Sequence, residues 1–224
     1  MTRQRPSKQI RALHLLAGLL VFLAMTLTLG EIAEDVRDGE PLTITDVRFS
    51  NWLHTHATAP LTKTMWVITW LHTSAVVCLA AVLVGFYLWR RREHYWMVAL
   101  WLSVFGGLAL NATLKLFFHR ARPHFRDAVQ ALTTYSFPSG HTMMATVLYG
   151  VLAAYCFTTT RDWRKRVLII FAAGFLILLV GFSRIYLGAH YLSDVLGAMA
   201  EGLAWLSLCL TVVDFWRRQS RRRS

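Results

Sequence analysis

The chain has 224 residues, of which 55% are hydrophobic and only 16% are charged. Its apolar residues gather in long runs that use up most of the chain, which excludes a set of separate soluble domains and is typical of an integral membrane protein. The net charge of +12 does not indicate a nucleic-acid partner, because the basic residues flank apolar runs and no recognition motif surrounds them.

Six stretches are long and apolar enough to cross a bilayer, since one helical span of the hydrocarbon core takes about 20 residues. They cover residues 12–29, 64–89, 95–118, 140–158, 167–187 and 190–213. We therefore expect an all-α, polytopic membrane protein, in which a bundle of six transmembrane helices forms a single domain over residues 1–224.

The first stretch has features of a signal peptide, because the basic residues of segment 1–11 precede its apolar run. No small-x-small cleavage site follows residues 29–31, so we expect a retained signal anchor. Residues 47–62, which come before the second stretch, mix aromatic and polar residues and predict a short amphipathic piece in the membrane interface. His54 and His56 within it have no carboxylate or cysteine beside them, and we expect no metal site there.

The last two stretches cannot form one membrane helix. A helix from residue 167 to residue 213 would be about 70 Å long at 1.5 Å per residue, more than twice the thickness of the hydrocarbon core. The chain must turn back between them, and Gly188 is the residue best suited to the turn.

Lysine and arginine residues predict the orientation of the bundle. Most of them lie on one side of a six-span chain, in four groups: Arg3, Arg5, Lys8 and Arg11; Arg90, Arg91 and Arg92; Arg161, Arg164, Lys165 and Arg166; Arg217, Arg218, Arg221, Arg222 and Arg223. The positive-inside rule makes this side cytoplasmic and places both termini there. The segment after the first stretch is acidic, with Asp46 among its carboxylates, as in an external loop.

A second set of basic residues departs from this bias. Its members lie at or near the external ends of the predicted spans: Lys115, Arg120, Arg122, Arg126 and Arg184. An ionisable side chain in or near hydrocarbon costs roughly 2.5 to 3.5 kcal/mol, so a cluster of them indicates function. A positive cluster on the outer face predicts an anionic ligand.

The segments around this cluster supply the groups that hold a phosphate. Lys115, Arg122 and Arg184 provide three positive charges, and the planar fork of arginine binds two phosphate oxygens at once. Ser139 offers a hydroxyl, and Gly140 opens a predicted helix whose first free amides point at an anion without a side chain in the way. This set requires neither a metal nor a cofactor.

Two histidines predict the chemistry at the phosphate. His190 and Asp194 are four residues apart and would be neighbours on one face of a helix, so the carboxylate can orient the ring and leave its other nitrogen as a nucleophile. His141 belongs to a different span, from which it can protonate the leaving oxygen as a general acid.

These segments also resemble the three signatures of the type 2 phosphatidic acid phosphatases, a family of lipid phosphate phosphatases. Lys115-Leu-Phe-Phe-His-Arg-Ala-Arg122-Pro123 is similar to the first, Pro138-Ser139-Gly140-His141 to the second, and Ser183-Arg184-Ile-Tyr-Leu-Gly-Ala-His190-Tyr-Leu-Ser-Asp194 to the third. All three occur in order within residues 115–194. Residues 1–94 carry no signature.

The resemblance implies a metal-independent hydrolase that forms a phosphohistidine on His190. Asp194 supports His190, His141 is the general acid, and Lys115, Arg122, Ser139, Gly140 and Arg184 hold the phosphate. The implied substrate is a lipid phosphate or pyrophosphate in the bilayer, with undecaprenyl pyrophosphate or phosphatidylglycerol phosphate favoured. The implied location is a bacterial inner membrane, with the site facing the periplasm.

Other functions remain compatible with the same residues. A phosphotransferase would pass the phosphoryl group from a lipid pyrophosphate to another lipid, and a lipid-phosphate binding or transport protein would keep the cradle without turnover. The presence of His190, Asp194 and His141 argues against the binding protein. The long apolar spans argue against a vanadium haloperoxidase.

Overall fold

The computed structural model describes residues 8–39, 41–123 and 134–223, and all regular structure within them is helical. The helices are α1 (Lys8–Asp38), α2 (Pro41–Thr55), α3 (Ala59–Leu71), α4 (Ser74–Arg90), α5 (His94–Trp101), the π-helix η1 (Leu102–Gly106), α6 (Gly107–Phe118), α7 (Gly140–Thr159), α8 (Trp163–Tyr186) and α9 (Leu192–Arg223). The described chain is all-α, as the sequence predicts.

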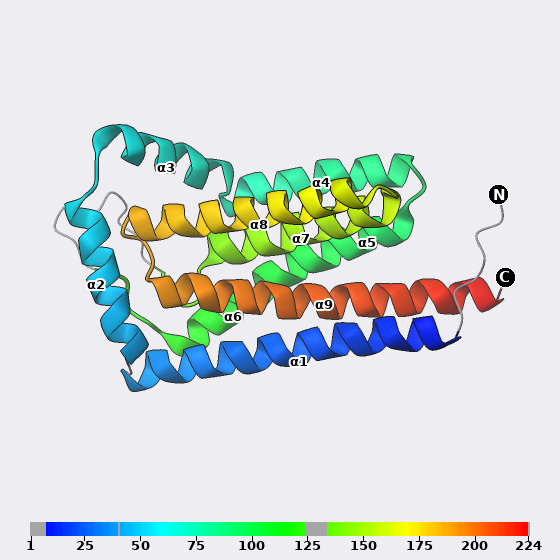
Figure 1. Ribbon diagram of the computed structural model, residues 1–224, viewed down its shortest axis with the longest axis horizontal. Coiled ribbons are helices and arrows are strands. Elements are labelled where there is room, and N and C mark those ends of the chain that lie inside the picture. The colour runs from blue at the N-terminus through cyan, green and yellow to red at the C-terminus, as the bar shows by residue number, and fades with distance from the viewer. Residues whose placement is uncertain (1–7, 40, 124–133, 224) are drawn as a thin grey trace.

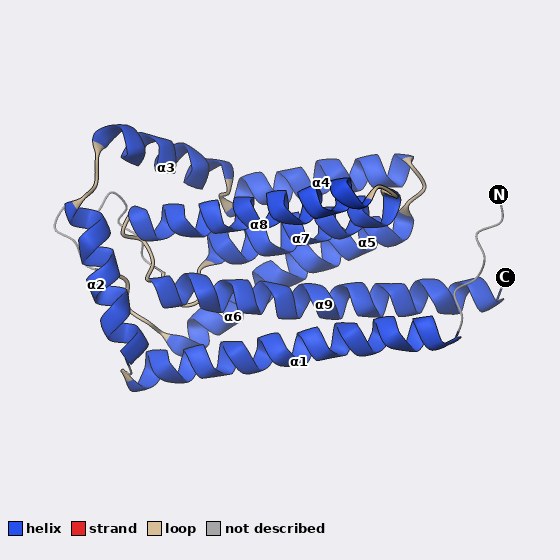
Figure 2. Cartoon of the chain, in the orientation of Figure 1, coloured by secondary structure: helices blue, strands red, loops and turns tan. Residues whose placement is uncertain are grey.

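The long helices run side by side in one elongated bundle (Figure 1). Helix α1 lies along α9, and both the start of α1 and the end of α9 are at the same end of the bundle. Helix α2 crosses the opposite end, where α6 stops and where α7 and α9 begin (Figures 1 and 2). Segments far apart in the sequence therefore meet at the α2 end.

Within the residues that the structure describes, five helical segments are long and apolar enough to cross a membrane, one of them made of α5, η1 and α6, and the bent pair α3 and α4 makes a sixth candidate. The sequence predicts a span over residues 64–89, and the structure divides it into α3 and α4, which are bent by 49° at the break between Leu71 and Ser74. His72 lies in the break. Its Nε2 is 2.6 Å from the hydroxyl of Tyr149 on α7, which ties the break to the bundle.

A π-helix joins α5 and α6 within one continuous span. The side chain of Trp205, on α9, packs against Gly106, where a Cβ would lie 2.5 Å from the indole. Its Nε1 donates to the carbonyl of Leu102 at 3.2 Å. The indole thus supplies a partner at the point where the regular α-helical ladder is interrupted.

Close packing of α8 and α7 against α9 brings the signature segments together. A Cβ at Gly181 would lie 2.6 Å from Val195, and one at Gly202 would lie 2.8 Å from Thr146. The turn between α8 and α9 contains Gly188, whose φ of +67° is a conformation that favours glycine. This confirms the predicted break and places the turn at the α2 end.

Candidate active site

The predicted site residues described by the structure all lie at the α2 end of the bundle. Ser139, Arg184, His190 and Asp194 are buried, with at most 2% of each residue exposed. The others, Lys115, Arg122, Gly140 and His141, are half-buried. Arg126, which the sequence places in the same positive cluster, lies outside the described residues.

His190 lies between a carboxylate and an arginine. Its Nδ1 is 3.3 Å from Oδ2 of Asp194, and its Nε2 is 3.2 Å from Nη1 of Arg122. Because arginine can only donate, Nε2 must accept, and the ring proton belongs on Nδ1, where it is donated to Asp194. Burial, and then the charges of Arg184, Arg122 and Lys115, hold the pKa of His190 well below its ordinary value. The structure therefore presents a neutral imidazole with the Nε2 lone pair directed at a cation.

The prediction that His190 and Asp194 share a helical face is wrong, because α9 begins only at Leu192. The two side chains meet through the helix cap instead. Oδ2 of Asp194 accepts a hydrogen bond of 2.9 Å from the backbone N–H of Tyr191, as a carboxylate at the third helical position does in a capping box. The same oxygen faces His190, so the cap fixes the carboxylate for the imidazole.

Two of the predicted cations hold the segment before α7. Lys115 Nζ donates to the carbonyl of Tyr135 at 2.9 Å. Arg122 donates to Thr134 O at 2.6 Å and to Ala189 O at 2.7 Å, so it links that segment with the α8–α9 turn. Electrostatic interactions also connect Lys115 with Arg122 and Arg184. The three predicted cations therefore lie in one cluster.

The second signature forms the start of α7. Ser139 is its N-cap, and its hydroxyl accepts a hydrogen bond of 3.1 Å from Thr142. The backbone N–H of Ser139 donates to the carbonyl of Asp194 at 3.0 Å, which joins the second signature to the third. Nε2 of His141 is buried and has no hydrogen-bond partner among the residues that the structure describes. Electrostatic interactions link His141 with Arg184 and His190.

This arrangement can be compared with known proteins. The family model described as the PAP2 superfamily matches residues 96–218, which is more than half of the chain. The chain belongs to the PAP2 superfamily. The match includes all three signatures and leaves α1 to α4 outside.

Curated relatives of this PAP2 chain include two proteins of Bacillus subtilis. Phosphatidylglycerophosphatase B is 38% identical over 147 residues, which are 64% of this chain and 70% of the relative. Undecaprenyl-diphosphatase BcrC is 32% identical over 139 residues, 58% of this chain and 64% of that protein. The crystal structure of the PAP2-type phosphatidylglycerolphosphate phosphatase from Bacillus subtilis matches 88% of this chain and 96% of its own, with a TM-score of 0.77 at 26% identity. The PAP2 membrane fold therefore extends beyond the signature region.

Sequence reasoning missed how Arg120 and Asp46 support the PAP2 signatures. Arg120 donates to Oδ1 of Asp194 at 2.5 Å and to Oδ2 of Asp46 at 2.8 Å, and both carboxylates are fully buried. Asp46, which is on α2, also accepts from the backbone N–H of Ser193 at 2.9 Å. The guanidinium of Arg120 thus connects Asp194, the carboxylate that orients His190, with α2, a helix that lies outside the family match.

A second polar pair, also missed, lies under the start of α7. Nδ2 of Asn111 donates to Oε2 of Glu201 at 2.9 Å and to the carbonyl of Pro138 at 3.5 Å. Both side chains are buried, with 3% of Asn111 and 1% of Glu201 exposed. A Cβ at Gly140 would lie 3.2 Å from Oδ1 of Asn111, so the amide packs closely against the first residue of α7. The signal was present in the sequence, because an ionisable residue inside an apolar span indicates a special role.

His56, which follows α2 directly, makes a local contact. His56 turns its Nδ1 to the carbonyl of Trp52 at 2.8 Å. No group of three or more His, Cys, Asp or Glu side chains with the arrangement of a metal site occurs within residues 8–39, 41–123 and 134–223.

Proposed function

We propose that this PAP2 chain is a lipid phosphatase that hydrolyses a phosphomonoester or pyrophosphate without a metal. The observation that carries the proposal is the state of His190, whose Nδ1 faces Asp194 and whose Nε2 faces Arg122. A neutral, oriented imidazole beside three buried or half-buried cations fits a nucleophile that attacks an anion.

The first step transfers the phosphoryl group to His190. The Nε2 lone pair forms a bond to phosphorus while the bond from phosphorus to the leaving oxygen breaks. Protonated His141 gives its proton to that oxygen, and Asp194 stabilises the positive charge that develops on the ring of His190. The charge on the phosphoryl oxygens is stabilised by three cations, Lys115, Arg122 and Arg184. The backbone amides at the start of α7 also bind these oxygens; Ser139 is the N-cap of this helix and Gly140 is its first residue.

The second step releases phosphate. Neutral His141 takes a proton from water, the water oxygen bonds to phosphorus, and the bond from phosphorus to Nε2 of His190 breaks. The imidazole recovers its lone pair, and His141 is again protonated for the next turnover. The cycle consumes one lipid phosphate and one water and returns His190 and His141 to their starting states, so it closes with residues of this chain alone.

The names of the relatives indicate the class of substrate. We favour undecaprenyl pyrophosphate or phosphatidylglycerol phosphate, because the relatives include an undecaprenyl-diphosphatase and a phosphatidylglycerophosphatase. The site is at the end of long apolar helices, where the phosphate of a lipid lies while its chains stay in the bilayer. A panel of purified lipid phosphates, scored by phosphate release, identifies the preferred substrate.

We also propose that the site faces the periplasm and that both termini are cytoplasmic, across six spans in a bacterial inner membrane. The basic residues at the end that holds the start of α1 and the end of α9 support this orientation. A membrane-impermeant thiol reagent added to intact cells with a permeable outer membrane should label Thr134→Cys but not Arg91→Cys. The reverse pattern would contradict the orientation.

The experiment that tests the activity is phosphate release from these lipids in detergent with excess chelator. We expect turnover by the wild type, and a loss of roughly 10⁴-fold or more in His190→Ala, because the nucleophile is absent. His56→Ala is the matched control, since this exposed histidine is at the same end of the bundle. Full activity of His190→Ala would exclude His190 as the nucleophile.

A further inference from the structure

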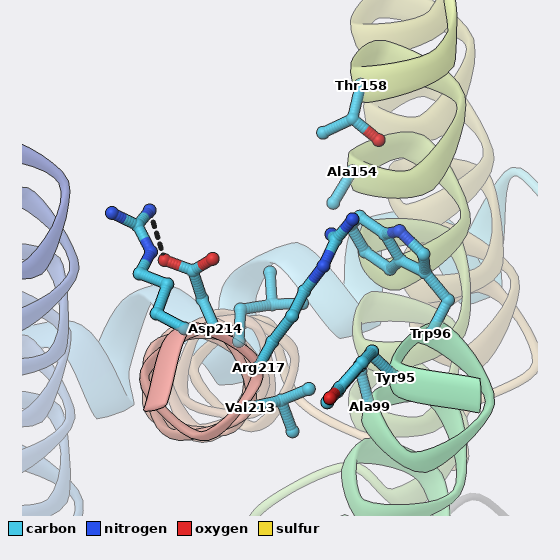
Figure 3. A pocket seen from close by; sticks show the side chains of 10 residues that line it. Tyr95, Trp96, Ala99, Ala154, Thr158, Val213, Asp214 and Arg217 are labelled. Carbon is cyan, nitrogen blue, oxygen red and sulfur yellow. Dashed lines mark ion pairs between the residues drawn. The ribbon is translucent and has the colours of Figure 1, made fainter. Parts of the chain in front are cut away.

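A pocket lies at the end of the bundle opposite the signatures. It has a volume of about 330 Å³ and is bordered by the first turn of α5, the second half of α7 and the last turns of α9. Its walls include Ala99, Ala154 and Val213, while Arg217 and the ring of Tyr95 lie at its polar side (Figure 3). The small alanine side chains leave the space, so the pocket is a feature of the packing of three helices.

The charges around this pocket are not balanced. Asp214 pairs with Arg218 one turn further along α9. Arg217 extends across the pocket in Figure 3, and its Cζ lies 5.8 Å from the centroid of the Tyr95 ring. Among the residues that the structure describes, Arg217 makes no ion pair with a carboxylate. The pocket therefore presents one uncompensated guanidinium above an apolar interior.

The position of the pocket along the helices matches the depth of lipid head groups. The pocket contains the start of the His94–Phe118 span and the last part of the Leu192–Ser220 span. Tyr95 and Trp96 have the amphipathic rings that favour the boundary between hydrocarbon and water. A ligand that fits must combine an anionic group for Arg217 with an apolar part for the alanine-lined interior.

We propose that this pocket binds an anionic phospholipid, with its phosphodiester at Arg217 and the start of its acyl chains between α5, α7 and α9. The lipid is a ligand rather than a substrate, because the pocket is lined by the start of α5 and the last part of α9, whereas the signatures lie where α7 and α9 begin, at the opposite end of the bundle (Figure 1). It joins the last turns of α9 to α5 and α7, so its binding stabilises the folded bundle.

The test uses the purified full chain in detergent and measures both retained lipid, by native mass spectrometry, and melting temperature. We expect phosphatidylglycerol to bind in preference to phosphatidylcholine with the same chains and to raise the melting temperature. Arg217→Gln should weaken phosphatidylglycerol binding about fivefold, the effect of one basic residue near an anionic lipid. Arg164→Gln is the matched control, because it removes the same charge from an exposed site at this end, outside the pocket.

A second variant tests the space independently of the charge. Ala154→Leu fills the interior and should also reduce retention of phosphatidylglycerol, while phosphate release by both variants stays at the level of the wild type. Equal binding of phosphatidylglycerol by the wild type and Arg217→Gln would overturn the proposal. So would equal stabilisation by phosphatidylcholine, or a full effect of soluble glycerol phosphate alone, which would indicate a simple anion site.

Discussion

The two ends of the bundle each hold an arginine–aspartate pair, but the pairs differ in burial and in connections. At the site end, Arg120 is 10% exposed and Asp194 is fully buried, and both belong to a network that reaches α2. At the far end, Arg218 and Asp214 are 24% and 37% exposed and lie one turn apart on the same helix. Removing one partner of a buried pair leaves an uncompensated charge, whereas an exposed pair contributes little. Activity should therefore be sensitive to substitutions in the Arg120–Asp194 pair and insensitive to substitutions in the Arg218–Asp214 pair.

The largest effect is expected from Asp194→Asn compared with Asp214→Asn. A neutral amide at position 194 cannot stabilise the positive charge that develops on the ring of His190, and it breaks the ion pair with Arg120, so kcat should fall by about 10³ to 10⁴-fold. Asp214→Asn should leave kcat within about twofold, because its carboxylate touches only the far end. Phosphate release measured for both variants checks the comparison, and equal losses would remove its basis.

A smaller effect is expected from Asp46→Asn, which weakens the contact between Arg120 and α2 at a position outside the signatures. Arg120 would keep Asp194 but lose its second carboxylate, and a small displacement of a catalytic group can cost about 10²-fold. We expect kcat to fall about tenfold to a hundredfold with KM less affected, and the melting temperature to drop. Asp38→Asn is the control, since this exposed carboxylate at the same end pairs with its neighbour Arg37. An active, stable Asp46→Asn protein would show that α2 does not support the nucleophile.

The pair under α7 should affect substrate binding more than chemistry. Asn111→Leu leaves Glu201 and the carbonyl of Pro138 without the donor at Asn111, which costs about 1 to 3 kcal/mol and allows the start of α7, where phosphate is proposed to bind, to shift. We expect KM to rise about tenfold. Glu201→Gln should be closer to the wild type than Glu201→Leu, because glutamine keeps an acceptor oxygen for Asn111. If the two Glu201 variants have the same KM, the hydrogen bond between Asn111 and Glu201 does not position the start of α7.

The smallest effect concerns stability at acid pH. The folded protein keeps His190 neutral because burial and three cations lower its pKa, whereas the unfolded chain takes up a proton near pH 6.5. Below that pH the unfolded state binds more protons, so stability falls as pH falls, and above it His190 contributes no pH dependence. The melting temperature of the wild type should drop more steeply than that of His190→Asn between about pH 6.5 and 5. Parallel curves would contradict a depressed pKa.

The membrane class and the signature residues were predictable because both depend on local signals. Apolar runs of bilayer length predict spans, and Lys115, Arg122, His141 and His190 are notable as polar residues at the ends of such runs. Gly188 is also a local signal, because a glycine between two apolar stretches that are too long for one membrane helix predicts a turn. Family membership follows from three spacings that occur in order.

The supporting contacts could not be read from the sequence, because they join elements that are far apart in it. Asp46 is one of several carboxylates in an acidic segment, and only the fold shows that it is buried against Arg120. The break at His72 lies inside an apolar run without proline, so the pattern favours an unbroken helix. The cap at Asp194 depends on the residue where α9 begins, and helix ends are poorly specified by sequence patterns.

The most direct test of the account is to trap the covalent intermediate. The wild-type protein is mixed with radiolabelled lipid phosphate, quenched in base after a fraction of one turnover, and digested for peptide mass spectrometry. The account predicts one phosphoryl group on His190, stable in base, lost in acid and absent from His190→Ala. A label on another residue, or turnover in which no phosphorylated peptide appears at any quench time, would contradict it.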